Sequence, residues 1–258
     1  MVKPKPFETL LERRHTESVV QTSVAISCFN HGTEGGEALS SLLRQTEESI
    51  NVVLIDDHST DDSVDLLLHW FETNPWQHKF KNVLFVRHLE NQGLTHARNT
   101  ALSLVTTPYI FILDADNQLY PRALRVLREA LENSGYAMAY SLLEKFGDET
   151  GIMGNSVWIP EKFSYYNYID AMTLIRTEVL RQIGGYRVMP NKFGWEDYDL
   201  WCTFVDMGLR GCHVPQILCR YRVQSSSMVR TITQSFITNE IAMVREDFER
   251  HHNHPFYF

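Results

Sequence analysis

Short apolar runs alternate with amphipathic stretches along the first half of the chain. Within those stretches apolar residues recur three and four positions apart, as expected of helices that cover a core. The runs that predict strands lie at residues 24–26, 51–55, 83–86, 109–113 and 136–140. Strands and helices that alternate with short connections predict an α/β fold with a doubly wound, mostly parallel sheet flanked by helices. In such sheets ligands bind beyond the carboxyl ends of the strands.

The second half of the chain is less regular and predicts a smaller subregion added to the sheet. Residues 1–22 are polar, with Phe7, Leu10 and Leu11 at helical spacing, which predicts a helical leader. We therefore divide the chain into a leader (1–22), a main domain (23–228), and a C-terminal amphipathic helix with its tail (229–258). The later segments are a polar loop (144–155), a strand-like piece (169–175), a helix ending at Gly184-Gly185, helices at 196–207 and 232–251, and strands at 211–214 and 217–223.

Charge and cysteine content narrow the class of protein. The 24 basic and 32 acidic side chains give a net charge of −8, which disfavours binding to a nucleic-acid backbone. The four cysteines form no CxxC pair, as expected of reduced thiols in the cytosol. No segment resembles a signal peptide, and no apolar run approaches the roughly 18 residues of a membrane span. We expect a cytoplasmic protein that is soluble or, at most, peripheral at the inner face of the membrane.

Two acidic clusters stand where predicted strands end. Asp114-Ala115-Asp116 follows the strand at 109–113, where two carboxylates can reach a hard divalent cation. The alternative is a turn with solvated acids. Asp56-Asp57 ends the strand at 51–55, where a carboxylate can accept from a base or a ribose hydroxyl, and the alternative is a plain helix-capping turn.

A third acidic cluster, Trp195-Glu196-Asp197, opens the helix predicted at 196–207. Acids at a helix start gain from the helix dipole, so one of them has a structural explanation. An acid there can also serve as a general base, and aromatic faces suit stacking on sugar rings.

Seven short motifs follow one another along residues 23–228. They are Ser27-Cys28-Phe29-Asn30, Gln45-Thr46, Asp56-Asp57-His58-Ser59-Thr60-Asp61, Asn91-Gln92-Gly93-Leu94 with Ala97-Arg98-Asn99, Asp114-Ala115-Asp116, Gly184-Gly185-Tyr186 and Trp195-Glu196-Asp197. Together they resemble the family 2 glycosyltransferases, inverting enzymes of the GT-A fold. The resemblance implies a nucleotide-binding half (23–118) and an acceptor and catalytic half (119–228). It implies Mn²⁺ or Mg²⁺ as cofactor, a nucleotide-sugar donor (UDP-sugar favoured), and a saccharide, lipid-linked or protein acceptor.

The resemblance also implies roles for residues around the nucleotide. Ser27 and Phe29 would line the base pocket, with Phe29 stacked on the pyrimidine. Asp57 would bind the base, and Gly93 would let the backbone approach the nucleotide. Arg98 would support that pocket rather than take part in the chemistry.

Further roles are implied for the metal and the reaction. Asp116 would be the main metal ligand, and Asp114, joined to it by Ala115 in the donor site, would face the ribose or a metal-bound water. Asp197 would be the catalytic base, with Glu196 beside it to orient acceptor or sugar. The Trp195 ring would belong to the same sugar-binding surface.

The sequence departs from the family pattern at several positions. Gln224 stands where relatives often carry a histidine near the metal, so coordination is expected to rest on Asp116, phosphates and water. Arg222 is a candidate for binding the diphosphate, and its alternative is a surface ion pair. Gln216 and Arg220 do not reproduce the QxxRW signature of processive synthases, which favours a non-processive enzyme. The pair Gly35-Gly36 replaces larger residues and is expected to loosen the start of the first helix.

Three other functions compete with this interpretation. A phospho-acceptor receiver domain shares the acidic pair, but it would begin with that strand and run only about 120 residues. A nucleotidyltransferase would carry basic residues in its first Gly-rich loop, whereas 32–36 holds Glu34 and no Lys or Arg. An inactive nucleotide-sugar-binding module would not be expected to keep Asp57, Asp114, Asp116 and Asp197 together. Residues 144–168 and 187–194 are expected to face the acceptor, and His251, His252 and His254 are interpreted as a frayed tail.

Overall fold

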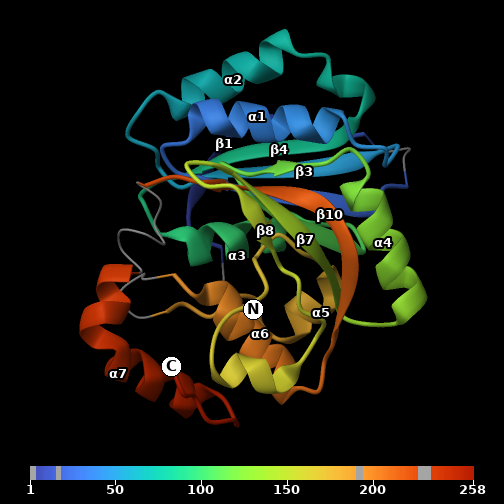
Figure 1. Cartoon of the computed structure of the whole chain (residues 1–258). Helices are drawn as coiled ribbons and strands as arrows, with labels where there is room; N and C mark the ends of the chain where they lie inside the picture. The colour runs from blue at the N-terminus through green and yellow to red at the C-terminus, as the bar shows by residue number, and fades with distance from the viewer. Residues whose placement is uncertain (1–3, 16–18, 190–193, 226–233) are drawn as a thin grey trace.

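The computed structural model describes residues 4–15, 19–189, 194–225 and 234–258, and these form one mixed ten-stranded sheet with helices on both faces (Figure 1). The strand order is β1-β4-β3-β2-β5-β9-β7-β10-β6, with β8 paired to β7. The strands are β1 (Phe7–Arg13), β2 (Thr22–Cys28), β3 (Ile50–Asp56), β4 (Phe80–His88), β5 (Tyr109–Asp114), β6 (Gln118–Leu119), β7 (Met138–Gly147), β8 (Gly151–Met153), β9 (Leu174–Arg176) and β10 (Gly211–Val223). The helices are α1 (Gly32–Leu43), α2 (Ser63–Thr73), α3 (Leu94–Leu104), α4 (Ala123–Ser134), α5 (Thr177–Gln182), α6 (Glu196–Asp206) and α7 (Gln234–His251), with 3₁₀ turns at Trp76–His78 and Pro160–Ser164.

The centre of the sheet is parallel, as the apolar runs predict. Strands β4, β3, β2 and β5 lie parallel to one another, and every residue of β3 is buried. Such strands are apolar on both sides because helices cover both faces. Helices α1 and α2 lie on one face and α3 and α6 on the other (Figure 1), and each face has its own hydrophobic core.

The predicted helical leader is wrong, because Phe7–Arg13 is an edge strand, β1, antiparallel to β4. The edge of β4 offers a row of main-chain groups that this segment satisfies. A register shift between Thr9 and Leu11 interrupts the alternation of the strand, and Leu10 and Leu11 both pack against the same core. Because of this irregularity, Leu10 and Leu11 do not alternate as strand residues usually do, and their distance from Phe7 in the sequence resembled helical spacing.

The second half contains more strand than its pattern predicts. Part of the expected loop 144–155 is a hairpin, because β7 runs on to Gly147 and β8 pairs back on it. The two strands expected at 211–214 and 217–223 are one long strand, β10, parallel to β7. Its register shifts between Val214 and Ile217, where Pro215 cannot donate a ladder hydrogen bond. The strand expected at 169–175 shrinks to β9, which lies antiparallel to β5 and β7.

Two smaller expectations are also corrected. Gly35 does not loosen α1, because a Cβ placed there would lie 3.0 Å from Leu67 Cδ2, so the missing side chain lets α1 pack closely on α2. The C-terminal histidines are not a frayed tail, since His252 is 8% exposed and packs behind α6. In the described part of the chain, no helix combines the length and apolarity needed to cross a membrane.

Candidate active site

The carboxyl ends of β2, β3 and β5 lie side by side and form the edge at which the motifs gather. Cys28 is opposite Asp56, and Ser27 is opposite Asp114. The Ala115 N–H donates to the Ser27 carbonyl (3.2 Å), which ties the turn after β5 to β2. Phe29 follows β2 directly and is 41% exposed, so its ring is accessible at this edge. Ser27, Phe29 and Ala115 therefore share one edge of the sheet.

Asp57 anchors the loop that carries Gly93. Its carboxylate accepts hydrogen bonds from the backbone N–H groups of Gln92 (2.9 Å) and Gly93 (2.6 Å), and it faces His88 Nδ1 at 2.7 Å. Gly93 has φ +90°, a conformation that favours glycine, and α3 begins immediately after it. The structure thus joins Asp57 and Gly93 directly, and it commits both Asp57 oxygens to the protein. A contact between Asp57 and a base stays a prediction.

The neighbouring acid, Asp56, explains the capping residues of the motif. The alternative for this cluster was a helix-capping turn with Ser59 or Thr60 as the cap, but the Ser59 N–H donates to Asp56 Oδ2 (3.0 Å) and its hydroxyl to Asp56 Oδ1. Helix α2 begins later, at Ser63. Asp56 is fully buried and serves the turn, so it is structural.

Asp114 and Asp116 stand together in the turn after β5. Burial and the negative charge of Asp114 raise the pKa of Asp116 to about 6, while His31 and Arg222 act in the opposite direction. Like charges this close disfavour double ionisation unless a cation joins them. Arg222 reaches the same turn, because its Nε donates to the Asp116 carbonyl (2.9 Å) and its N–H to Asn117 Oδ1 (2.8 Å). The Arg222 guanidinium also pairs with Glu37, the ion pair expected as its alternative role, and binding of the diphosphate stays a prediction.

Arg98 connects this turn with α6 across the edge. Its side chain is 2% exposed, and its guanidinium donates to Asp114 Oδ1 (2.8 Å) and to Glu196 Oε1 (2.5 Å). Burial opposes the charge of Arg98, but the two carboxylates outweigh it and raise the guanidinium pKa above its usual value. Asp114 and Glu196 are 82 residues apart in the sequence. Arg98 therefore holds together two acidic clusters that are distant along the chain.

A cleft of about 570 Å³ opens where the two clusters meet. Among the described residues its lining includes Asp114 but not Asp116. Tyr221 also lines the cleft, and burial together with the charges of Asp170, Asp114, Asp116 and Asp197 raises the pKa of its hydroxyl. The cleft lining includes Arg98, Asp114, Asn167, Asp170, Trp195 and Asp197.

The surroundings of Asp197 bring the pKa of its carboxyl group close to neutral pH. It is the second residue of α6, and burial followed by the charge of Glu196 raises its pKa to about 7. Arg98, the Tyr198 N–H and the Asn167 amide lower it in part, with Asn167 Nδ2 3.0 Å from Asp197 Oδ2. A carboxylate with these properties can take up a proton near pH 7.

Sequence reasoning missed Asn167 and Asp170, which line the same cleft. Burial and the charges of Asp114 and Asp197 raise the pKa of Asp170 to about 7, while the Met172 N–H partly opposes them. β9 pairs antiparallel with β5, with Leu174 opposite Phe111, so the residues before β9 run toward the end of β5. Neither residue belongs to a motif, and only this non-local pairing brings them to the site.

Solved structures share this fold. The structure of S. aureus TarS in complex with UDP-GlcNAc has a TM-score of 0.65 at 15% identity, over 82% of this chain and 61% of that one. The mannosyltransferase PcManGT from Pyrobaculum calidifontis, in complex with GDP-Man and Mn²⁺, has a TM-score of 0.63 at 21% identity, over 82% and 59%. The chain thus spans about three fifths of each, and the likeness shows a GT-A fold.

Sequence relatives span the chain more completely. EpsE of Bacillus subtilis (strain 168), which carries a provisional glycosyltransferase name, is 25% identical over 226 residues, 86% of this chain and 80% of EpsE. The Escherichia coli UDP-Glc:alpha-D-GlcNAc-diphosphoundecaprenol beta-1,3-glucosyltransferase WfaP is 23% identical over 235 residues, 89% of this chain and 88% of WfaP. The sequence model of the family described as glycosyl transferase family 2 matches residues 23–193, two thirds of the chain. The chain belongs to this family, and it is a glycosyltransferase.

Proposed function

We propose that this glycosyltransferase moves a sugar from a nucleotide diphosphate sugar to an acceptor hydroxyl by direct displacement, with inversion at the anomeric carbon. The observation that carries the proposal is the Arg98 bridge, which joins Asp114 at the end of β5 to Glu196 beside Asp197 at the start of α6. A donor end and a base end then share one cleft, as a single displacement requires.

The residues at the end of β5 fit a divalent cation. Asp116 is raised to a pKa of about 6 by burial and by Asp114, so the pair carries negative charge that a cation would relieve. Carboxylate oxygens are ligands that Mn²⁺ and Mg²⁺ prefer. Within the described ranges no cluster of three or more His, Cys, Asp or Glu side chains could hold a metal alone. Asp116 and Asp114 would therefore share the ion with phosphate oxygens and water.

The nucleotide would lie on the edge formed by β2 and β3. Phe29 offers an accessible ring for stacking on a base, beside Ser27. The Gly93 loop, held by Asp57, would approach the nucleotide through its backbone. A UDP-sugar is favoured, because the names of TarS and WfaP pair them with UDP-GlcNAc and UDP-Glc, although PcManGT is paired with GDP-Man.

The reaction would use Asp197 as general base. When bound, the cation offsets charge on the departing diphosphate. The Asp197 carboxylate takes the proton of the acceptor hydroxyl while that oxygen attacks the anomeric carbon from the face opposite the diphosphate. Glu196, fixed by Arg98, orients the reacting groups, and Trp195 offers a ring to a sugar. A pKa of about 7 suits a base that works near neutral pH.

The acceptor is proposed to be a saccharide, free or carried on a lipid or a protein, in non-processive glycan or polysaccharide synthesis. The Ile152–Ser156 stretch and Tyr166 line the mouth of the cleft, within the region expected to face the acceptor. The name of WfaP includes a diphosphoundecaprenol acceptor, which supports a lipid-linked saccharide. We propose that the enzyme is cytoplasmic, soluble or at most peripheral at the inner face of the membrane.

A thermal-shift screen tests the donor and the metal together. UDP-glucose, UDP-N-acetylglucosamine and GDP-mannose are each added with and without Mn²⁺, and release of free nucleoside diphosphate is measured for every binder. We expect one donor to raise the melting temperature only with Mn²⁺. Asp116→Asn should lose that metal-dependent shift.

The matched variant Asp197→Asn separates binding from chemistry. It should keep the donor's thermal shift and lose about 10²–10⁴ in turnover, the usual contribution of a positioned base. Wild-type turnover in Asp197→Asn would reject the assignment of the base. Release of pyrophosphate in place of nucleoside diphosphate would reject sugar transfer itself.

A further inference from the structure

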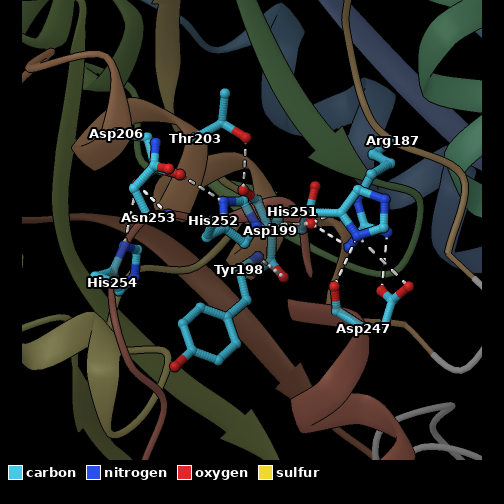
Figure 2. Close-up of polar contacts among 11 residues, drawn as sticks. Arg187, Tyr198, Asp199, Thr203, Asp206, Asp247, His251, His252, Asn253 and His254 are labelled. Atoms are coloured by element: carbon cyan, nitrogen blue, oxygen red, sulfur yellow. Dashed lines mark hydrogen bonds and ion pairs between the residues drawn. The ribbon is translucent and has the colours of Figure 1, made fainter. Parts of the chain in front are cut away.

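Helix α6 is held from behind by charged side chains on the side away from the cleft. Residues two positions apart in a helix point about 200° apart around its axis, so Asp199 points away from Asp197. Asp199 is 2% exposed, and its carboxylate accepts from Arg187 Nε (2.7 Å) and lies 3.0 Å from His252 Nε2 (Figure 2). Burial acts to raise the pKa of Asp199, but His252 and Arg187 outweigh it and lower that pKa. The helix is thus tied through a buried, ionised carboxylate.

One partner of Asp199, His252, belongs to a C-terminal segment, residues 247–258, and the other, Arg187, precedes α6 in the sequence. Arg187 also donates to Asp247 Oδ2 (2.8 Å), which joins it to the end of α7. His252 Nδ1 lies 2.8 Å from Asp206 Oδ2, so one imidazole ring connects two acids of α6 (Figure 2). The Asn253 N–H adds a bond to Asp206 Oδ1 (3.0 Å). Each ring nitrogen of His252 therefore faces one carboxylate of α6.

Aromatic side chains cover the same side of α6. Phe248 and Phe256 are 0% and 2% exposed. The Phe258 ring lies 5.2 Å from Trp195, and the Phe248 ring lies 5.2 Å from Tyr198, measured between ring centroids. The C-terminal segment therefore contacts both residues that flank Glu196 and Asp197.

We propose that the C-terminal segment is a positioning part of the active site, which acts through His252 and Arg187 on Asp199 to fix the helix that carries Glu196 and Asp197. Arg98 holds Glu196 from the cleft side, and Asp199 is held from the opposite side, so α6 is fixed on both. The match to the family ends at residue 193, before α6 and this segment. The consequence for catalysis rests on the proposed function, since it assumes that Asp197 is the base. A displacement of about 1 Å at a reacting group can cost on the order of 10²-fold in rate.

His252→Ala tests the inference, with His69→Ala as the control. His69 is a histidine of α2, on the other face of the sheet, and its side chain is 71% exposed. Hydrogen exchange is followed in peptides covering α6 and, for comparison, β2 and β3. Turnover is followed as UDP release from UDP-glucose and from UDP-N-acetylglucosamine with Mn²⁺, and UDP affinity is measured by calorimetry.

We expect His252→Ala to raise exchange in residues 195–201 while β2 and β3 stay protected. Its kcat should fall at least about tenfold with UDP affinity unchanged. Free imidazole, which fits the space left by the ring, should restore both kcat and protection, and His69→Ala should behave as wild type. Should His252→Ala fail to fold, His252→Gln, which keeps an N–H toward Asp199, carries the same comparison with a smaller effect.

Two outcomes overturn the inference. One is wild-type exchange in 195–201 together with wild-type kcat. The other is exchange that rises equally in α6, β2 and β3 without recovery in imidazole, because that indicates general loss of stability. A wild-type enzyme that neither binds UDP nor releases it refutes the proposed function instead, and the exchange measurements then still decide whether the segment positions α6.

Discussion

At the residue scale, the proposed base depends on neighbours that are not acids. The charge of Glu196 disfavours the ionised form of Asp197, and the charge of Asp197 in turn disfavours that of Asp170. Arg98 and the amide of Asn167 favour the ionised form of Asp197, and Asn167 is the one that reaches Asp197 directly from the other wall of the cleft. The Asp197 carboxyl group has to be ionised before it can accept a proton. Asn167 therefore affects both the pKa of that group and the orientation of its carboxylate.

Removing the Asn167 amide should therefore shift the pH dependence of turnover. Asn167→Ala removes a hydrogen bond that favours the carboxylate, so the pKa of Asp197 rises. Activity then falls at a higher pH as the medium is acidified. A hydrogen bond that favours the ionised form by about 1 kcal/mol corresponds to a shift of roughly half to one pH unit. The profile of kcat between pH 5 and 9 measures this shift.

Asn155→Ala is the comparison for that profile. Asn155 lines the same cleft, and in Asn155→Ala kcat should fall on acidification at the same pH as in the wild type. If Asn167→Ala also left that pH unchanged, Asn167 would not influence the base.

At the element scale, the start of α1 depends on glycine because it lies against α2. A Cβ added at Gly32 would lie 2.5 Å from Ser63 Cα, a backbone atom that cannot move cheaply. We expect Gly32→Ala to cost about 1–3 kcal/mol, the usual range for overpacking, which lowers the melting temperature by roughly 5 °C. Thermal unfolding followed by circular dichroism measures it.

Gly36→Ala provides the matched control in the same helix. A Cβ there would lie 3.3 Å from the Trp70 ring, which can shift slightly. Replacing glycine with alanine inside a helix gains about 1 kcal/mol, which offsets the cost of shifting the Trp70 ring, so this variant should melt close to the wild type. Equal melting of Gly32→Ala and the wild type would contradict the close approach of α1 and α2.

The elements that the sequence predicts well are those decided by local pattern. Runs such as 51–55 are apolar throughout because both faces are covered, and they formed the expected parallel strands. β1 could not be foreseen in this way, because it is a strand only through the free edge of β4. The motif acids were found because each stands at the end of a strand or the start of a helix. Asn167 and Asp170 were missed because the antiparallel pairing of β9 with β5, which places them, leaves no local signal.

At the scale of the whole molecule, the acids of the site make the folded state less stable when they are ionised. The folded-state pKa values of Asp116, Asp170 and Asp197 are about 6, 7 and 7, each above the usual 3.8, with burial as the largest cause. Groups with raised carboxyl pKa values bind protons in the folded chain that the unfolded chain has already released. Their contribution to stability is full below about pH 4 and is lost as the pH rises through about 7. Asp199 acts in the opposite direction, since its pKa is lowered and its contribution is lost on acidification below about pH 4.

Asp170→Asn isolates one part of this charge without removing a proposed metal ligand or base. Asparagine has nearly the same shape and can still accept the hydrogen bond from the Met172 N–H, but it cannot ionise. In the absence of ligand, the variant should melt several degrees above the wild type at pH 8, where Asp170 is charged, and close to it at pH 5, where Asp170 is protonated. Glu72→Gln, whose parent side chain is 76% exposed, should show no such divergence between the two pH values. The variant and the wild type could instead differ in melting temperature by the same amount at every pH from 5 to 8. That result would mean that the charges of Asp114 and Asp197 do not act on Asp170, and that these three acids and Asp116 do not interact as one cluster.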